Sequence, residues 1–156
     1  VIKSLDYFEK MGISSLWLNP VLENNMETYS YHGYAMTNLY NVDPRYGTNE
    51  QYKELADKAK EKGIGIIMDQ VANHIGSLHP WMSDLPSEDW VNQWPEFTHT
   101  NHMKVSRFDP HAAEVDRKQF TDGWFVETMP DLNQRNEKLA RYLIQNSIYT
   151  WLIKRA

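Results

Sequence analysis

The feature that most constrains the fold is a unit of helix, glycine and apolar strand that occurs twice in the chain. In the first copy, residues 2–11 carry apolar side chains at near-helical spacing, and Gly12 follows as a stop signal. Residues 13–19 (ISSLWLN) are then a largely apolar run that ends at Pro20. This unit predicts a helix followed directly by a buried strand.

The second copy has the same order. The apolar spacing predicts a helix over residues 50–61, with Asn49 as its N-cap and Gly63 as its C-terminal stop. An apolar run over residues 64–71 (IGIIMDQV) predicts the second strand. Two such units in series favour parallel strands covered by helices, because strands buried on both faces read as continuous apolar runs. The predicted fold class is therefore α/β.

The remaining segments divide the chain into three predicted regions. Residues 75–133 form a long irregular stretch rich in Trp and Phe. Loops of this length are uncommon without structure of their own, so we interpret the stretch as a small inserted subdomain. The final region carries a predicted apolar helical stripe of Leu139, Leu143, Ile144, Ile148, Trp151 and Leu152. The regions are therefore 1–74 for the two units with their Tyr-, Asn- and Gly-rich loop at 21–48, 75–133 for the insertion, and 134–156 for the last helix.

Charge and composition exclude several classes of partner. The formal net charge is -5 and the pI is about 5.6, so the chain has no general electrostatic attraction to nucleic acid or anionic lipid. No apolar run approaches the roughly 18 residues of a transmembrane helix. There is also no cysteine for a disulfide or a thiolate metal site. We therefore predict no nucleic-acid partner and no membrane insertion.

Side chains able to do chemistry are predicted where the strands meet their loops. In parallel α/β folds, the loops at the carboxyl ends of the strands converge on the ligand site. The candidates come from three loops and are His32, Tyr34, Asp69, Asn73, His74 and Asp131. Carboxylates and amides beside aromatic rings suit a sugar site, since they bind hydroxyls while a ring stacks on the apolar face of a pyranose.

The same residues have other interpretations. Oxygen atoms of Asp69, Asn73 and Asp131 would suit Ca²⁺, and His74 would suit a transition metal. A zinc-binding helix is not supported, because position 78, four residues after His74, is Leu. In a purely structural role, the acids and amides would form turns and the aromatic residues would pack the subdomain.

Five motifs occur in an informative order. They are GISSLWLNP (12–20), YHGY (31–34), DPRYGT (43–48), DQVANH (69–74) and MPDLN (129–133). In order and spacing they resemble motifs of the α-amylase family of glycoside hydrolases (glycoside hydrolase family 13), and MPDLNQRN is most similar to the cyclomaltodextrinase and neopullulanase branch. The resemblance implies a partial (β/α)₈ TIM barrel. This chain would supply barrel strands 2 and 3 with flanking helices, the domain B-like segment after strand 3, and the helix that leads to strand 4.

The resemblance also implies roles for single residues. Tyr34 would stack under the sugar at the cleavage subsite, with His32 beside it. His74 would hydrogen-bond a hydroxyl of the same sugar. Asp69 would lie at the strand end inside the barrel and support the arginine that neighbours the nucleophile in this family.

For cofactors, the resemblance implies Ca²⁺ alone and no organic group. Asn73 and Asp131 match positions that bind Ca²⁺ in part of the family, and the MPDLN branch often lacks that site. The resemblance further implies that none of the catalytic carboxylates is in this chain. The nucleophilic Asp, the acid/base Glu and the third carboxylate would follow beyond Ala156.

The functional expectation is a piece of a retaining hydrolase of α-1,4-glucans (starch, maltooligosaccharides or cyclodextrins) that is inactive by itself. The alternatives are a stand-alone α-glucan binding module and an α/β domain that merely packs these residues. We expect the isolated chain to self-associate through uncovered apolar faces. The resemblance implies a periplasmic or secreted location, although the chain itself carries no signal peptide.

Overall fold

The structure, a computed structural model, describes residues 1–28 and 31–153, so positions 154–156 of the predicted last region lie outside it. Strands β1 (Ser15–Leu18) and β4 (Gly65–Met68) pair in parallel and form a two-stranded sheet. This confirms the predicted parallel α/β arrangement. The paired segments are shorter than the predicted strands, because the chain leaves the ladder at both ends of each apolar run.

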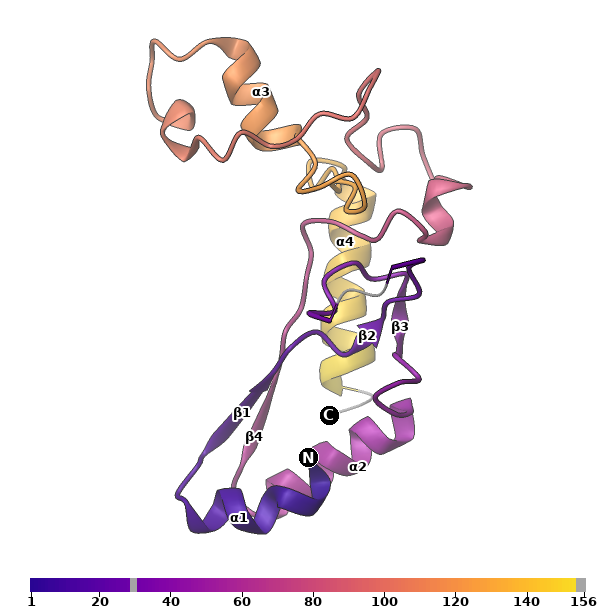
Figure 1. Cartoon of the computed structure of the whole chain (residues 1–156), viewed down its shortest axis with the longest axis vertical. Helices are drawn as coiled ribbons and strands as arrows, with labels where there is room; N and C mark the ends of the chain where they lie inside the picture. The colour runs from indigo at the N-terminus through magenta and orange to yellow at the C-terminus, as the bar shows by residue number, and fades with distance from the viewer. Residues whose placement is uncertain (29–30, 154–156) are drawn as a thin grey trace.

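Two helices cover one face of this sheet near the start of its strands (Figure 1). They are α1 (Leu5–Lys10), which follows a 3-10 helix at Ile2–Ser4, and α2 (Asn49–Glu61). Their buried side chains, Leu5, Leu55 and Ala59, pack with Ile64 against Leu16, Leu18 and Ile66. The opposite face of the sheet carries Trp17 and Ile67, which are 73% and 47% exposed. One face of the sheet is therefore covered and the other is open.

The N-cap of α2 differs from the prediction by one residue. Thr48 is the N-cap: its side chain accepts a hydrogen bond from the Gln51 main-chain N–H, and the Gln51 side chain accepts one from the Thr48 N–H. Asn49 instead accepts from the Val42 main-chain N–H at 2.9 Å. The prediction of Asn49 was wrong because a reciprocal capping box satisfies two main-chain donors, whereas a lone Asn cap satisfies fewer.

The predicted loop at 21–48 contains a small sheet of its own. Strand β2 (Leu22–Glu23) pairs antiparallel with β3 (Asn38–Val42). Beyond β3, the buried Asp43 carboxylate accepts from the main-chain N–H groups of Asn24 and Arg45 and from two nitrogens of the Arg45 guanidinium. The Arg45 guanidinium lowers the pKa of Asp43 to about 2. This ionic turn fixes the return of the chain towards α2.

Residues 75–133 contain little regular structure. Their helices are two 3-10 turns, Pro80–Met82 and Lys104–Arg107, and α3 (Glu114–Asp122). Figure 1 shows α3 at the end of the molecule opposite α1 and α2. Trp90, Val91 and Leu132 join the main hydrophobic core, with Leu22, Met36 and Ile75. The segment is thus attached to the core at its base and extends away from it.

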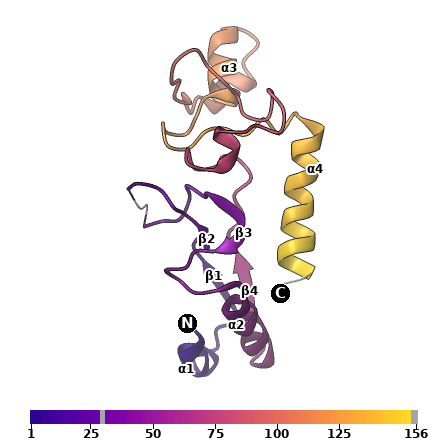
Figure 2. The ribbon, with the colours of Figure 1, turned by 90° about the vertical axis from the view of Figure 1, so that its right-hand side faces the viewer.

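The last helical region consists of α4 (Glu137–Gln145), capped by Asn136, and a π-helical continuation at Asn146–Ile153. It stands along one side of the molecule (Figure 2). Of the predicted apolar stripe, Leu139, Leu143 and Trp151 are buried, but Ile144, Ile148 and Leu152 are exposed. The predicted stripe is therefore covered on the side that faces the core and open on the other side. In the described residues, no helix is long and apolar enough to cross a membrane.

Candidate functional site

The three predicted loops meet around residues 73–77, here called the central segment. On one side, the Gly76 N–H donates to the Met36 carbonyl at 2.8 Å. On the other side, the Ser77 N–H donates to the Thr128 carbonyl at 3.0 Å, and the Leu132 N–H donates to the Asn73 carbonyl at 2.8 Å. The structure therefore brings the YHGY, DQVANH and MPDLN motifs together at the carboxyl end of β4.

Tyr34 and Asp69 form the first contact of the site. The Tyr34 hydroxyl donates to Asp69 Oδ2 at 3.0 Å, and this hydrogen bond raises the pKa of Tyr34. The preceding Gly33 has a φ of 79°, and a Cβ at this position would lie 2.4 Å from the Pro20 carbonyl oxygen. Only glycine fits such a conformation and contact. The tight passage of Gly33 along Pro20 thus sets where the Tyr34 ring lies.

The two predicted histidines have different surroundings. His32 Nδ1 accepts from the Tyr34 main-chain N–H at 3.1 Å, and its ring lies 5.3 Å from the Tyr34 ring. His74 is only 8% exposed, and burial lowers its pKa. Its Nε2 donates to the Tyr34 carbonyl at 3.0 Å, and its Nδ1 lies 3.3 Å from the Asn73 amide nitrogen. A sugar hydroxyl that reaches His74 would share one of these nitrogens with its present partner.

Asp131 is buried among amides. Its Oδ1 accepts from the Asn73 amide at 3.2 Å and its Oδ2 accepts from the Asn92 amide at 2.7 Å. Burial raises the pKa of Asp131 to about 6, and the two amide hydrogen bonds oppose that rise. Arg135 lies beside this cluster, where it donates to Asn92 Oδ1 at 3.2 Å and pairs with Asp122 at 2.8 Å. The nearby negative charge of Asp122 raises the pKa of Asp131, and the positive charge of Arg135 lowers it.

This arrangement does not fit a calcium ion. Ca²⁺ takes six to eight oxygen ligands, but both oxygens of Asp131 accept amide N–H groups and Asn73 presents its nitrogen to the carboxylate. Within the described part of the chain, no three or more His, Cys, Asp or Glu residues are grouped as a metal site. Asn73 and Asp131 therefore act together as a hydrogen-bonded pair, with Asn92 completing the set.

Three residues that the structure places at the site were not among the predicted site residues. Phe125 stacks on the His74 ring, with centroids 5.9 Å apart and planes 12° apart. Asn92 and Arg135 complete the surroundings of Asp131. No local motif marks Asn92 or Phe125, because each reaches the site only through the path of residues 75–133. Arg135 lies within the MPDLNQRN stretch that carries the resemblance, and that stretch is the signal that could have marked it.

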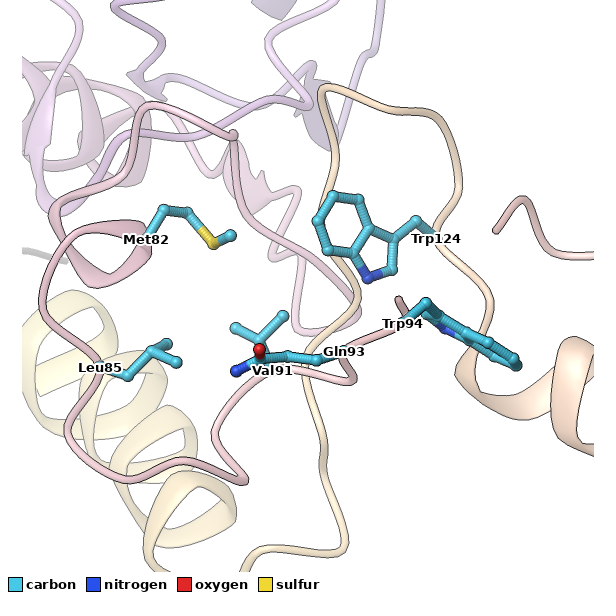
Figure 3. A pocket seen from close by; sticks show the side chains of 6 residues that line it. All are labelled: Met82, Leu85, Val91, Gln93, Trp94 and Trp124. Atoms are coloured by element: carbon cyan, nitrogen blue, oxygen red, sulfur yellow. The ribbon is translucent and has the colours of Figure 1, made fainter. Parts of the chain in front are cut away.

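A small pocket of about 170 Å³ lies in the 75–133 region (Figure 3). Its lining consists of Met82, Leu85, Val91, Gln93, Trp94 and Trp124, none of which is a predicted site residue. Trp94 Nε1 donates to the Asp122 carbonyl and Trp124 Nε1 donates to the Asn92 carbonyl. Both indoles thus offer only their apolar faces to the pocket, which is consistent with packing between loops.

A cluster of acid, amide and aromatic groups at the end of a parallel strand is typical of ligand sites in parallel α/β enzymes. The sequence profile described as "Alpha amylase, catalytic domain" matches residues 1–156. The chain therefore belongs to the α-amylase family, as its five motifs predicted.

Individual relatives agree with this assignment. Alpha-amylase 3 of Dictyoglomus thermophilum is 47% identical, covering 95% of this chain and 30% of that protein. The crystal structure of the Geobacillus thermoleovorans alpha-amylase complexed with acarbose matches with a TM-score of 0.75 and 34% identity, over 99% of this chain and 30% of that one. A cyclomaltodextrinase structure shares the fold at a TM-score of 0.64 and 24% identity, over 96% of this chain and 24% of that one. The chain thus spans less than a third of the length of these relatives.

Proposed function

We propose that this chain is one part of an α-amylase-type catalytic barrel. In this proposal, β1 and β4 are barrel strands 2 and 3, residues 75–133 are domain B, and residues 134–156 lead to strand 4. The parallel pairing of β1 with β4, the open face at Trp17 and the match over all 156 residues support it. The site then lies at the carboxyl ends of the strands, where barrel enzymes bind their ligands.

The proposed activity is retaining hydrolysis of α-1,4-linked glucans such as starch, maltooligosaccharides or cyclodextrins. The observation that carries it is the hydrogen-bonded set of Tyr34, Asp69 and His74 beside His32. It presents a ring for stacking and an imidazole for a hydroxyl, as a pyranose requires. The relatives named alpha-amylase, one of them complexed with acarbose, support the same substrate class. A periplasmic or secreted location remains part of this proposal.

Asp69 and Asp131 are not the catalytic pair in this proposal. Retaining hydrolysis uses two carboxyl groups about 5–5.5 Å apart, one to attack the anomeric carbon and one to protonate the leaving oxygen. Asp69 accepts the Tyr34 hydroxyl, and both oxygens of the buried Asp131 are bonded to amides. Their proposed roles are to position the site, and the nucleophile and acid/base come from outside this chain.

Two assays test the function. The 156-residue chain should not hydrolyse starch or cyclodextrin, and robust hydrolysis by it would contradict the assigned roles of Asp69 and Asp131. In a longer protein that contains the chain, Tyr34→Ala should lower kcat/KM on maltoheptaose by about tenfold or more. Tyr34→Phe keeps the stacking ring but loses the bond to Asp69, so it should retain more activity than the Ala variant. Unchanged turnover in Tyr34→Ala would favour a purely structural site.

A stand-alone glucan-binding module is the second candidate, and the exposed Phe97, Phe108 and Phe125 of the 75–133 region favour it. Titration calorimetry with maltoheptaose on the 156-residue chain separates the two. Part of a barrel, with some of its subsites missing, should bind at about millimolar strength or weaker, roughly -4 kcal/mol. Micromolar binding would favour the module.

A further inference from the structure

Four aromatic side chains of the 75–133 region form a row that begins at His74. Phe125 stacks on His74, and the His102 ring meets Phe125 edge-on at 5.9 Å. The His99 ring follows at 5.3 Å from His102, and Phe97 at 6.3 Å from His99. All four lie at the surface, with Phe97 44% and Phe125 46% exposed. We call these four residues the aromatic row.

Hydrogen bonds between two stretches of main chain fix the backbone that carries the row. The Thr100 N–H donates to the Trp124 carbonyl at 2.8 Å, and the Trp124 N–H donates to the Thr98 carbonyl at 2.9 Å. Gly123 permits this approach, because a Cβ there would lie 2.6 Å from the Thr100 Cα. The two stretches that carry the row are therefore held side by side rather than left as free loops.

The backbone conformation of His102 supports a functional role for the aromatic row. Its φ is 55°, and no other non-glycine residue in the described part of the chain has a positive φ. A positive φ is uncommon for a non-glycine residue, although histidine adopts it more readily than most, and residues held in sparsely populated conformations cluster at functional sites. The ring is exposed, so core packing does not explain why a histidine occupies this position. Glycine would fit the backbone better but would leave a gap in the row.

We propose that the aromatic row binds glucose units of an α-glucan beyond the unit held at Tyr34 and His32. The proposal rests on the proposed function and extends it from one sugar to a chain of sugars. Phenylalanine faces stack on the apolar side of a pyranose, and imidazole nitrogens bind its hydroxyls. His99 already donates from Nδ1 to the Thr100 carbonyl at 2.5 Å, so its Nε2 is the acceptor left for a hydroxyl. The contact with His74 makes the row continuous with the site.

The experiment compares substrates of different length in the longer protein that contains this chain. His102→Gly removes the imidazole and suits the positive φ, so the variant should keep its fold. Phe97→Ala removes the far end of the row. Phe108→Ala is the matched control, because Phe108 is a more exposed phenylalanine of the same region outside the row. The measurement is kcat/KM on maltotriose and on maltoheptaose, with a thermal melt of each variant.

For His102→Gly and Phe97→Ala, we expect the ratio of kcat/KM on maltoheptaose to that on maltotriose to fall about three- to tenfold. In Phe108→Ala the ratio should match the wild type. If the wild type cleaves both substrates and the row variants keep its ratio, the row is not a binding track, although the proposed function stands. If the wild type neither cleaves nor binds either glucan, both proposals fail, and the wild-type data alone show it.

Discussion

His79 is a residue whose protonation the fold opposes. It is buried, its Nδ1 accepts from the Trp81 main-chain N–H at 3.1 Å, and burial lowers its pKa to about 4. The unfolded chain has a histidine pKa near 6.5, so acid favours unfolding. The contribution to stability is complete above pH 6.5 and is lost as the pH falls towards 4.

This gives the first prediction. The free energy of unfolding should fall by up to about 3 kcal/mol between pH 6.5 and 4 through His79 alone. His79→Asn, which can still cap the following 3-10 turn, should lack this contribution, whereas the opposite contribution of Asp131, whose pKa is raised to about 6, is present in both chains. The free energy of unfolding of the wild type relative to that of His79→Asn should therefore fall as the pH drops from 6.5 to 4. Urea denaturation of both chains at several pH values measures it. An equally steep slope in His79→Asn would show that other groups carry the acid sensitivity.

A second prediction at the residue scale concerns Asp131 and calcium. Since Asn73 and Asn92 occupy both carboxylate oxygens, we expect neither added Ca²⁺ nor EGTA to shift the melting temperature by more than about 1 °C. Asp131→Asn should destabilise the chain with or without calcium, because it breaks the amide contacts. A calcium-dependent rise in melting temperature that Asp131→Asn abolishes would contradict the assigned geometry.

At the scale of elements, α2 depends on its capping box for its first turn. Thr48→Ala removes the acceptor for the Gln51 N–H and should destabilise the chain by about 1 kcal/mol. Thr48→Ser keeps the hydroxyl and should lie close to the wild type. Chemical denaturation of the three chains measures the difference. If Asn49→Ala proved more damaging than Thr48→Ala, Asn49 would be the N-cap, as the sequence predicted.

Some of the helices and strands could be predicted from sequence patterns, and others could not. The two parallel strands were predictable because apolar runs after glycine stops depend on local composition. The β2–β3 pair was not, since Leu22–Glu23 is too short to leave a pattern. The apolar stripe of the last helix was predictable, but a period of 3.6 residues does not show how much of such a face a neighbour covers. The burial of Leu143 and the exposure of Ile144 and Ile148 came only from the structure.

At the scale of the whole molecule, two apolar surfaces are uncovered. Trp17 and Ile67 lie on the open face of the sheet, and Ile144, Ile148 and Leu152 lie along the last helix. Exposed apolar patches of this kind promote association. We predict that the 156-residue chain self-associates in solution, with an apparent mass that rises with concentration in light scattering.

Two variants test whether the open face of the sheet causes this association. Trp17→Lys should reduce association, because it places a charge on the open face of the sheet. Tyr7→Lys is the control, because Tyr7 is also an exposed aromatic residue but lies on α1 and not on the open face of the sheet. This variant should associate like the wild type. A monodisperse monomer with a sharp cooperative melt would contradict the prediction for the unmodified chain.

The sequence alone determined the parallel α/β class, the family and the three loops that form the candidate site, because glycine stops, apolar runs and motif order are local features. Only the tertiary structure decided what each site residue contacts. Tyr34 reaches Asp69 across 35 positions, and Asp131 takes its amide partners from residues 58 and 39 positions away. Such contacts depend on where the chain returns in space, and the path of residues 75–133 sets the aromatic row in the same way. A local sequence pattern does not show which path residues 75–133 take.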